Sequence, residues 1–450
     1  MKKIKHNKAH IISLGCPKNL IDSEVMGGLL SQSGLQMVDR NDSADIVIVN
    51  TCAFINPAKE EALEEILTLA ETKKKGNRQF KLVVAGCLAQ RYGKELSAQI
   101  PEVDLFIGTG EVGNIVRHIN KLDEIKFRRT SVISKPDFLM TSQHPRNLPS
   151  TATSTYLKIS DGCSNCCSYC VIPAIRGKAR SRTPDDILQE AANLANKGIK
   201  EIIITAQDTT AYGRDLKGKP QLSDLLTHMS ELKGIKWIRL LYAHPAHITT
   251  DLLKAIAANK KICRYIDLPI QHIDDTILQS MNRKITGAKI KEVIAQARLI
   301  IPDVALRTSL MVGFPGETKK RLEKLLDFVR ETKFDHLGVF TYSREEGTAA
   351  AQIKSQISEK EKERYRDLIM NEQAAISHAI NKCLMGSIQE VLIEEKSDRP
   401  CYDFIGRCRR QAPEIDGVTY IKGAQLKIGS IVKCEIIAAD DYDLFGEIIY

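Results

Sequence analysis

Four cysteines fall within eight residues, in the run Cys163-Ser-Asn-Cys166-Cys167-Ser-Tyr-Cys170, directly after a strand-like segment at Tyr156–Ser160. Cys163, Cys167 and Cys170 have the spacing of a three-cysteine iron–sulfur site. A four-iron cluster takes four ligands, so three thiolates leave one iron open. An open position on a metal can bind a substrate directly. The run therefore predicts a catalytic cluster on a loop that follows a strand.

The same cysteines can also be divided into two pairs, Cys163 with Cys166 and Cys167 with Cys170, which would suggest zinc. Structural zinc sites place a loop or hairpin between their two pairs. Here the pairs are adjacent, and the neighbouring side chains of Cys166 and Cys167 point in different directions. We therefore favour the iron–sulfur cluster, with Cys166 as a bystander or a spare ligand.

The composition is typical of a soluble globular protein. Of the 450 residues, 43% are hydrophobic and 27% are charged, and the length suggests about three domains. No run approaches the roughly 20 apolar residues that span a bilayer, and Ile11–Leu14 is too short for the core of a signal peptide. We expect a cytoplasmic protein with no membrane partner, whose twelve cysteines are reduced thiols or metal ligands.

The net charge of +9 is unevenly distributed along the chain. Residues 385–450 contain twelve acidic and eight basic residues, a net charge of −4, so the preceding 384 residues carry +13. A basic body with an acidic C-terminal module is an asymmetry that bears on the choice of partner.

Before residue 125, short apolar runs alternate with amphipathic stretches, as in βαβ units. Three of these runs lead directly into Cys16, Cys52 and Cys87: His10–Gly15, Asp45–Thr51 and Lys81–Gly86. Ligands of open α/β sheets bind outside the carboxyl ends of the strands. A single cysteine in such a place is usually a small buried apolar residue. Three at the same structural position, two of them after Gly15 and Gly86, predict a second three-cysteine iron–sulfur site.

Two helices are expected between these strands, at Leu20–Ser33 and Pro57–Lys73. Their first turns would contain acidic residues, where the helix dipole favours negative charge. These residues are Asp22 and Glu24 in one helix, and Glu60 and Glu61 in the other.

From Tyr156 onward, strand and helix patterns alternate six times. The expected strands are Tyr156–Ser160, Glu201–Ala206, Trp237–Ala243, Tyr265–Ile270, Val304–Val312 and His336–Tyr342. Six βα units are too few for a closed eight-stranded barrel, so we expect an open (β/α)6 barrel. By analogy with closed barrels, its chemistry should lie at the C-terminal strand ends, where the cysteine run falls.

Cofactor contacts are expected at other strand ends of this barrel. Gln207 and Asp208 follow the second strand, and Gly313, Gly316 and Glu317 follow the fifth and lead into a helix. The two glycines would let backbone approach a ligand, and a helix start offers free amides. A glycine-containing loop is, by itself, more often only a turn.

Two arginines, Arg176 and Arg307, lie near the expected mouth of the barrel. Either could neutralise a cofactor carboxylate. For any single arginine, however, a surface ion pair is the usual role.

The C-terminal part begins with a long charged helix, Glu359–Leu384, which we expect to carry the chain away from the barrel. Strand patterns at Ile388–Ile393, Val418–Ile421, Ser430–Ala438 and Leu444–Ile449 then predict a small antiparallel barrel. Its acidic residues would repel RNA and attract a basic protein, or form only a solvated rim: Glu414, Asp416, Asp440, Asp441 and Asp443. The expected divisions are 1–125, a linker at 126–155, 156–357, 358–384 and 385–450.

Five motifs are spread over the chain: Ser13-Leu-Gly-Cys-Pro-Lys-Asn-Leu20, Asn50-Thr-Cys-Ala-Phe-Ile55, Gln207-Asp-Thr-Thr-Ala-Tyr-Gly213, Phe340-Thr-Tyr-Ser-Arg-Glu-Glu-Gly347 and Ala412-Pro-Glu-Ile-Asp-Gly417. With the domain order, they make essentially the whole chain resemble the radical S-adenosylmethionine (AdoMet) methylthiotransferases with a C-terminal TRAM-like domain. The motifs resemble the branch that acts on small-subunit ribosomal protein twelve. The tRNA-modifying branch usually has Gln-Met-Asn where this chain has Pro17-Lys18-Asn19.

The resemblance implies two [4Fe-4S] clusters and AdoMet as cofactors. The cluster on Cys163, Cys167 and Cys170 would cleave AdoMet to a radical that removes hydrogen from an aspartate β-carbon of protein twelve. The second cluster would hold the sulfur, and a second AdoMet would supply the methyl group. An electron donor such as flavodoxin or ferredoxin would be a further partner, and DNA would not be one.

Two other functions remain open from the sequence. The basic body and the TRAM-like tail also suit methylthiolation of tRNA adenosine, and a non-catalytic iron–sulfur protein that binds RNA is an alternative of another class. The chain also departs from the family pattern at Cys166, and at Cys408 with Arg409 and Arg410, which add positive charge before the last motif.

Overall fold

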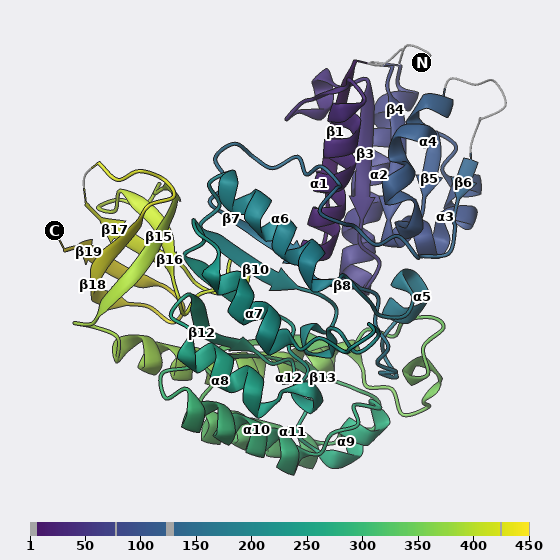
Figure 1. Ribbon diagram of the computed structural model, residues 1–450. Helices are drawn as coiled ribbons and strands as arrows, with labels where there is room; N and C mark the ends of the chain where they lie inside the picture. Colours follow the sequence, from purple (N-terminus) through teal and green to yellow (C-terminus); the bar gives the residue numbers. More distant parts are fainter. Residues whose placement is uncertain (1–6, 77–78, 123–129, 424, 450) are drawn as a thin grey trace.

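The computed structural model describes residues 7–76, 79–122, 130–423 and 425–449. Figure 1 shows two α/β domains and a small barrel in chain order, coloured purple to blue, teal to green, and yellow. The expected division at 125/126 lies outside the described residues. Within the described part of the chain, no helix is both long and apolar enough to cross a membrane.

The N-terminal domain contains a parallel sheet of six strands in the order β2-β1-β3-β4-β5-β6. Every residue of Ile46–Thr51 is buried, as expected for a parallel strand covered on both faces. Its strands are β1 Lys8–Ser13, β2 Gln36–Met37, β3 Ile46–Thr51, β4 Lys81–Gly86, β5 Leu105–Ile107 and β6 Thr130–Val132. Its helices are α1 Pro17–Gln32, α2 Asn56–Lys74, α3 Cys87–Gln99 and α4 Ile115–Lys121.

The acidic residues assigned to the first turns of α1 and α2 lie further inside these helices, so that prediction is wrong. Helix α1 begins at Pro17 instead of Leu20, and neither helix has an acidic residue in its first turn. Proline suits the first position because the missing N–H has no partner there. Asp22 instead pairs with Lys158 of the central domain, and Glu24 pairs with Arg146 in the segment that precedes this domain.

The central domain is an open parallel sheet in which each strand lies beside the next in sequence, which confirms the predicted (β/α)6 arrangement. Its strands are β7 Ser154–Lys158, β10 Glu201–Thr205, β11 Trp237–Leu240, β12 Ile262–Asp267, β13 Ala305–Val312 and β14 His336–Thr341, with the short pair β8 Ser160–Asp161 and β9 Arg180–Ser181. Its helices are α5 Ile172–Arg176, α6 Pro184–Asn196, α7 Leu222–Glu231, α8 Thr250–Ala258, α9 Asp275–Ser280, α10 Gly287–Ile300, α11 Lys319–Thr332 and α12 Glu359–Lys382.

Helix α12 does not carry the chain away from the barrel, contrary to expectation. Tyr365 and Ile369 are part of the barrel's hydrophobic core. The side chains of Gln373 and Ser377 donate to the carbonyls of Phe334 and Asp335, at distances of 2.7 and 3.0 Å. The helix looks polar in sequence because only a narrow stripe is apolar, and that stripe covers β14.

The C-terminal domain is a closed five-stranded barrel in the order β15-β16-β17-β19-β18. Its strands are β15 Ile388–Lys396, β16 Phe404–Cys408, β17 Thr419–Lys422, β18 Ile431–Ala439 and β19 Leu444–Ile448. The sequence prediction missed β16, a short strand between turns, and β17 pairs with β19 in parallel rather than antiparallel. Closure of the barrel removes the exposed sheet edges.

Candidate active site

Cys16, Cys52 and Cys87 lie at adjacent strand ends of the N-terminal sheet, because β1, β3 and β4 are neighbours. Gly15 and Gly86 both have positive φ, +89° and +91°, which glycine adopts readily. A Cβ atom on Gly15 would lie 2.5 Å from the Cβ of Cys52. The chain can therefore bring the loops that bear these cysteines together only with glycine at this position.

The pKa values of the three thiols are shifted in different directions. Burial raises the pKa of Cys52 and raises that of Cys87 to about 12. Burial favours a higher pKa for Cys16 as well. The positive charges of Lys18 and Arg176 act in the opposite direction, and the net pKa of Cys16 is lowered. The Cys16 thiolate also raises the pKa of Cys52, and both raise that of Cys87, since like charges disfavour ionisation. Such a group of thiolates is stabilised when it binds a metal or cluster.

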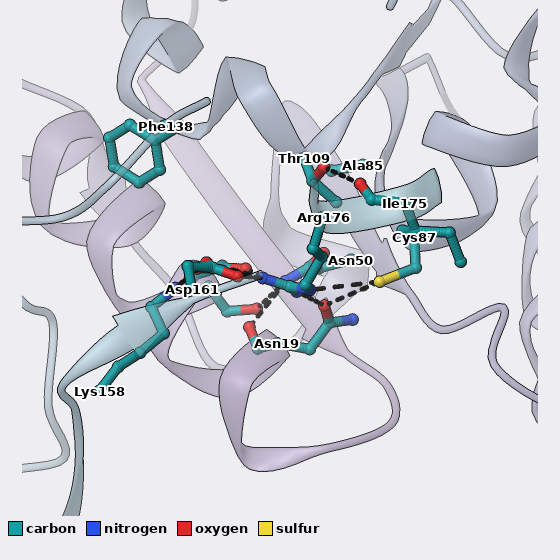
Figure 2. A network of polar contacts seen from close by, with 12 residues as sticks. Asn19, Asn50, Ala85, Cys87, Thr109, Phe138, Lys158, Asp161, Ile175 and Arg176 are labelled. Atoms are coloured by element: carbon teal, nitrogen blue, oxygen red, sulfur yellow. Dashed lines mark hydrogen bonds and ion pairs between the residues drawn. The ribbon is translucent and has the colours of Figure 1, made fainter. Parts of the chain in front are cut away.

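A buried arginine connects this thiol group to the central domain (Figure 2). Arg176, at the end of α5, is 3% exposed, so it is not the surface ion pair expected from the sequence. Its guanidinium donates to Asn19 Oδ1 at 2.8 Å and to Asp22 at 2.9 Å, both on α1, and to Asp161 at 3.1 Å. It also lies 3.8 Å from the Sγ of Cys87.

Lys158, fully buried on β7, completes the network. Its ammonium lies 2.6 Å from Asp22 and 2.8 Å from Asp161. Two cations thus face two carboxylates, and the network is close to neutral. Although burial opposes ionisation, Lys158 and Arg176 hold the pKa of Asp161 well below its usual range. The sequence prediction assigned no role to Lys158 or Asp161, because the network also needs Asp22, which lies 136 positions from Lys158.

Two asparagines hold the strand ends of the N-terminal site in place. The amide of Asn19 donates to the carbonyls of Leu14 and Thr51, at 3.0 and 2.8 Å. The amide of Asn50 donates to the carbonyl of Asn19 at 2.8 Å. Both asparagines fall in the motifs identified from the sequence, but nothing in the sequence pattern distinguished them as structural.

The barrel cysteines lie on the loop between β8 and α5, at the C-terminal strand ends of the sheet. Cys163, Cys167 and Cys170 are partly exposed, whereas Cys166 is exposed. Burial raises the pKa of Cys163 to about 11 and that of Cys170 to about 12. Arg283, which is buried, lies with Nη1 3.7 Å from the Sγ of Cys167. Each three-cysteine group therefore has one buried arginine beside it.

The four cysteines of the barrel loop do not form a compact set of ligand atoms. Among the described residues, only Asp208, His244 and His247 bring three potential ligand atoms within 4.8 Å of one another. Cys163, Cys166, Cys167 and Cys170 form no such group, whereas a tetrahedral zinc site with bonds of about 2.3 Å would need one.

The residues after β10 are brought to the cysteine loop, as predicted. Asp208 accepts from Asn165 at 2.7 Å and pairs with Nδ1 of His247 at 2.8 Å. Burial would raise the pKa of Asp208, but the His247 hydrogen bond holds it below its usual range. Gln207 donates to Asp161 at 3.2 Å. The sequence prediction missed His244 and His247, although they follow β11 at the equivalent strand end.

The glycine loop after β13 packs against the barrel in a way the sequence did not indicate. Helix α11 begins at Lys319, so Glu317 lies before it instead of opening it. Glu317 is buried, accepts from the backbone N–H of Gly313, and lies 3.1 Å from Nε2 of His272. A Cβ on Gly313 would lie 2.2 Å from Lys362 of α12, so close packing of α12 explains that glycine.

Gly316 has a φ of +87° and open space around it, with the Oγ of Ser355 3.9 Å from an added Cβ. Phe314, in the same loop, packs on Tyr169 of the cysteine loop with ring centroids 6.5 Å apart. The two loops are thus in direct contact at the barrel mouth.

Arg307 is buried and paired with carboxylates rather than exposed. It lies 2.9 Å from Asp267 and 3.3 Å from Asp416 of the C-terminal barrel. Asp416 also accepts from the hydroxyl of Tyr265 at 2.7 Å, and its side chain is 1% exposed. Asp416 therefore joins the C-terminal barrel to the central sheet and is not available to attract a basic partner.

The N-terminal and central domains are also held together at the loop after β14. Glu345 is 1% exposed and pairs with Lys59 at 2.9 Å and with Arg91 at 2.7 Å. Together with the Arg176 network, this contact holds the two three-cysteine sites on facing strand ends of the two α/β domains.

Three family matches cover most of the chain. Residues 8–108 match the uncharacterized protein family UPF0004, residues 157–329 the Radical SAM superfamily, and residues 385–449 the TRAM domain. Among solved structures, the radical AdoMet methyltransferase TsrM from Kitasatospora setae, with cobalamin and a [4Fe-4S] cluster bound, has a TM-score of 0.54 at 15% identity and covers 88% of this chain and 82% of its own. At that identity, the likeness concerns the fold alone.

Curated relatives match from end to end. The chain is 55% identical to a ribosomal protein uS12 methylthiotransferase RimO of Syntrophus aciditrophicus, with 99% of each chain covered. It is 48% identical to one of Geobacter sulfurreducens, with 98% of each covered. These identities extend over the full domain order that the sequence motifs indicated. The chain belongs to the family of the ribosomal protein uS12 methylthiotransferases RimO.

Proposed function

We propose that this chain is a radical AdoMet enzyme that methylthiolates the β-carbon of an aspartate in ribosomal protein uS12. The observation that carries this proposal is the placement of two three-cysteine groups on facing strand ends, joined by the buried Arg176. A reaction that needs both a radical source and a sulfur source requires two such centres close together.

The cysteines fit two [4Fe-4S] clusters. Cys163, Cys167 and Cys170 would hold one, and the other would be held by Cys16, Cys52 and Cys87. When bound, the clusters and AdoMet supply the electron, the radical and the transferred methylthio group. Each set offers three thiols with a buried arginine next to it, which offsets the negative charge that thiolate ligands bring.

The chain's own residues position these groups. Asn165, between two of the barrel cysteines, is held by Asp208, which His247 in turn orients. The edge-to-face contact of Tyr169 with Phe314 connects the cysteine loop to the glycine loop. We infer AdoMet contacts at the strand ends after β10 and β13, from Gln207, Asp208, Gly313, Gly316 and Glu317. We infer a further contact from Arg307, which lies on β13 and is paired with Asp267 and Asp416.

The protein substrate and the reductant complete the proposal. Asp440 and Asp441 are exposed on the C-terminal barrel and can attract a basic ribosomal protein, whereas Asp443 accepts from the backbone of Val418. Flavodoxin or ferredoxin would supply electrons, and the cytoplasm is the compartment that contains ribosomes. We assign domain roles to residues 1–125, 156–357 and 385–450, connected by 126–155 and 358–384.

The test is an anaerobic reaction of the reconstituted protein with AdoMet, reductant and either small ribosomal subunits or unmodified tRNA. Mass spectrometry should find one methylthio group on a uS12 aspartate and none on tRNA. Cys52→Ala should abolish the transfer, and Cys166→Ala should leave it intact. A methylthio group on tRNA, or full activity of Cys52→Ala, would contradict the proposal.

A further inference from the structure

A groove of about 900 Å³ lies at the opposite end of the central domain from the cysteine sites. One wall is formed where strands of the central sheet begin, by Lys200, Lys236 and Lys261, which directly precede β10, β11 and β12. The other wall belongs to the C-terminal barrel and includes Gln389 and Arg409. Figure 1 shows this barrel, in yellow, beside the ends of the central strands that face away from the N-terminal domain.

The groove is strongly basic. Its only acidic lining residues are Asp303 and Glu390, within the described part of the chain, and both already face arginines, Arg264 at 2.7 Å and Arg409 at 3.7 Å. They are outnumbered by seven basic lining residues: Lys200, Lys236, Lys260, Lys261, Arg264, Arg409 and Arg410. This excess of positive charge is not neutralised within the groove, so the basic side chains repel one another and attract a polyanion.

Three of these cations have no partner in the protein. Among the described residues, the ammonium groups of Lys200, Lys236 and Lys260 form no ion pair or hydrogen bond. Lys236 and Lys260 are exposed and Lys200 is partly exposed. They are therefore free to bind an anion without breaking an existing contact.

The walls of the groove are fixed before any partner binds. Arg409 donates to the carbonyls of Lys260 and Ile262, at 2.6 and 2.9 Å. Deeper in the junction, Glu201 pairs with Arg407 at 2.6 Å, and both side chains are buried. Arg407 and Arg409 thus hold the two domains together, and Arg409 also lines the groove.

The lining also indicates what part of a polyanion is recognised. The only aromatic lining residue is Trp237, which is 1% exposed, so no ring in the described groove is available for a base to stack on. Proteins that read single-stranded bases present exposed aromatic side chains, whereas lysines and arginines contact phosphates. A groove with free lysines and no exposed aromatic ring is suited to binding the phosphate backbone of a nucleic acid, whatever its base sequence.

We propose that this groove binds the phosphodiester backbone of structured RNA. The identity of this RNA rests on the proposed function: it would be the ribosomal RNA that surrounds the protein substrate. The basic end of the central domain would then hold the small subunit while the cysteine sites act on its protein. The exposed acidic residues of the C-terminal barrel, Asp440 and Asp441, are not part of the groove lining.

The test measures binding of the full chain to a fluorescein-labelled RNA hairpin by fluorescence anisotropy, from 50 to 300 mM salt. The variant is Lys236→Ala with Lys260→Ala, and the matched control is Lys74→Ala with Lys94→Ala, two exposed lysines of the N-terminal domain. Because two phosphate contacts are lost, the salt slope of the variant should be smaller than that of the wild type by about 1.4–1.8. Between 50 and 300 mM salt the wild type should therefore lose roughly 12- to 25-fold more affinity than the variant. The control should retain the wild-type slope.

Three results would overturn the proposal: no RNA binding at 50 mM salt, a groove variant that binds like the control, or equal loss of binding to polyglutamate, which would point to an acidic protein as the occupant. A second readout separates this proposal from the proposed function. The groove variant should require more small subunit for half-maximal methylthiolation, and the control should not. If the wild type modifies no uS12 but RNA binding follows the lysines, only the proposed function fails.

Discussion

Replacement of Lys158 by methionine tests whether the network between the two cysteine sites stabilises the protein as its geometry implies. Lys158 is fully buried and pairs with Asp22 and Asp161, which Arg176 also contacts. Without the lysine, two buried carboxylates share one guanidinium. Removal of one partner from a buried ion pair costs about 3–5 kcal/mol, because a charge is left uncompensated.

The expected loss can be measured by thermal unfolding of the cluster-free protein. For a domain of this size, 1 kcal/mol corresponds to about 2–4 °C, so Lys158→Met should lower the Tm by about 6–20 °C. A second change, Asp22→Asn, should recover part of this loss because it restores the charge balance. The matched control is Lys289→Met, which breaks an exposed pair with Glu292 and should cost under about 1 kcal/mol.

The pH dependence follows from the same network. The pKa of Asp161 is lowered on folding, so its contribution to stability is present above the carboxyl's ordinary pKa and disappears as the pH falls. Lys158→Met removes part of that contribution, and the variant should unfold at higher pH than the wild type during acid titration. A Tm within 2 °C of wild type, or a double variant no more stable than the single one, would refute the reasoning.

Three further predictions concern the thiols and the domain junction. In cluster-free protein at pH 7, iodoacetamide should label Cys16 well before Cys87, since neighbouring cations lower the first pKa and burial raises the second to about 12; equal rates by mass spectrometry would contradict this. Iron uptake during reconstitution should increase from pH 7 to 9, because a thiol such as Cys170, with a pKa of about 12, must lose its proton to bind iron; iron content that falls with pH would argue against it. Arg407→Met should destabilise the protein by about 3–5 kcal/mol by leaving Glu201 with one partner fewer, and should expose the C-terminal barrel to limited proteolysis; an unchanged cleavage pattern would disprove that role.

The arrangement of charges gives the C-terminal barrel two different faces. Asp416 is buried against the central sheet and is part of the domain junction. Asp440 and Asp441 remain exposed, while Arg409 lines the basic groove. The net charge of the C-terminal barrel therefore hides a separation of charge, since its acidic and basic side chains lie on different parts of its surface.

Much of the fold could be predicted because the signals are local. The apolar runs before Cys16, Cys52 and Cys87 are strands, and six further runs form the open sheet in the expected order. The errors occurred where local signals are weak. Strand β16 is short and lies between turns, and helix α12 has so narrow an apolar stripe that its packing on the barrel was not recognised.

The sequence by itself determined which residues can carry the chemistry, because cysteine spacing and strand periodicity depend on neighbours a few positions away. Only the tertiary structure decided what the charged residues do. Arg176 meets Asn19 across 157 positions, and Arg407 meets Glu201 across 206. Ion pairs and hydrogen bonds act over a few ångströms regardless of sequence separation. Their partners, and hence the roles of Lys158, Arg307 and the groove lysines, therefore followed from packing of the domains and not from any local pattern.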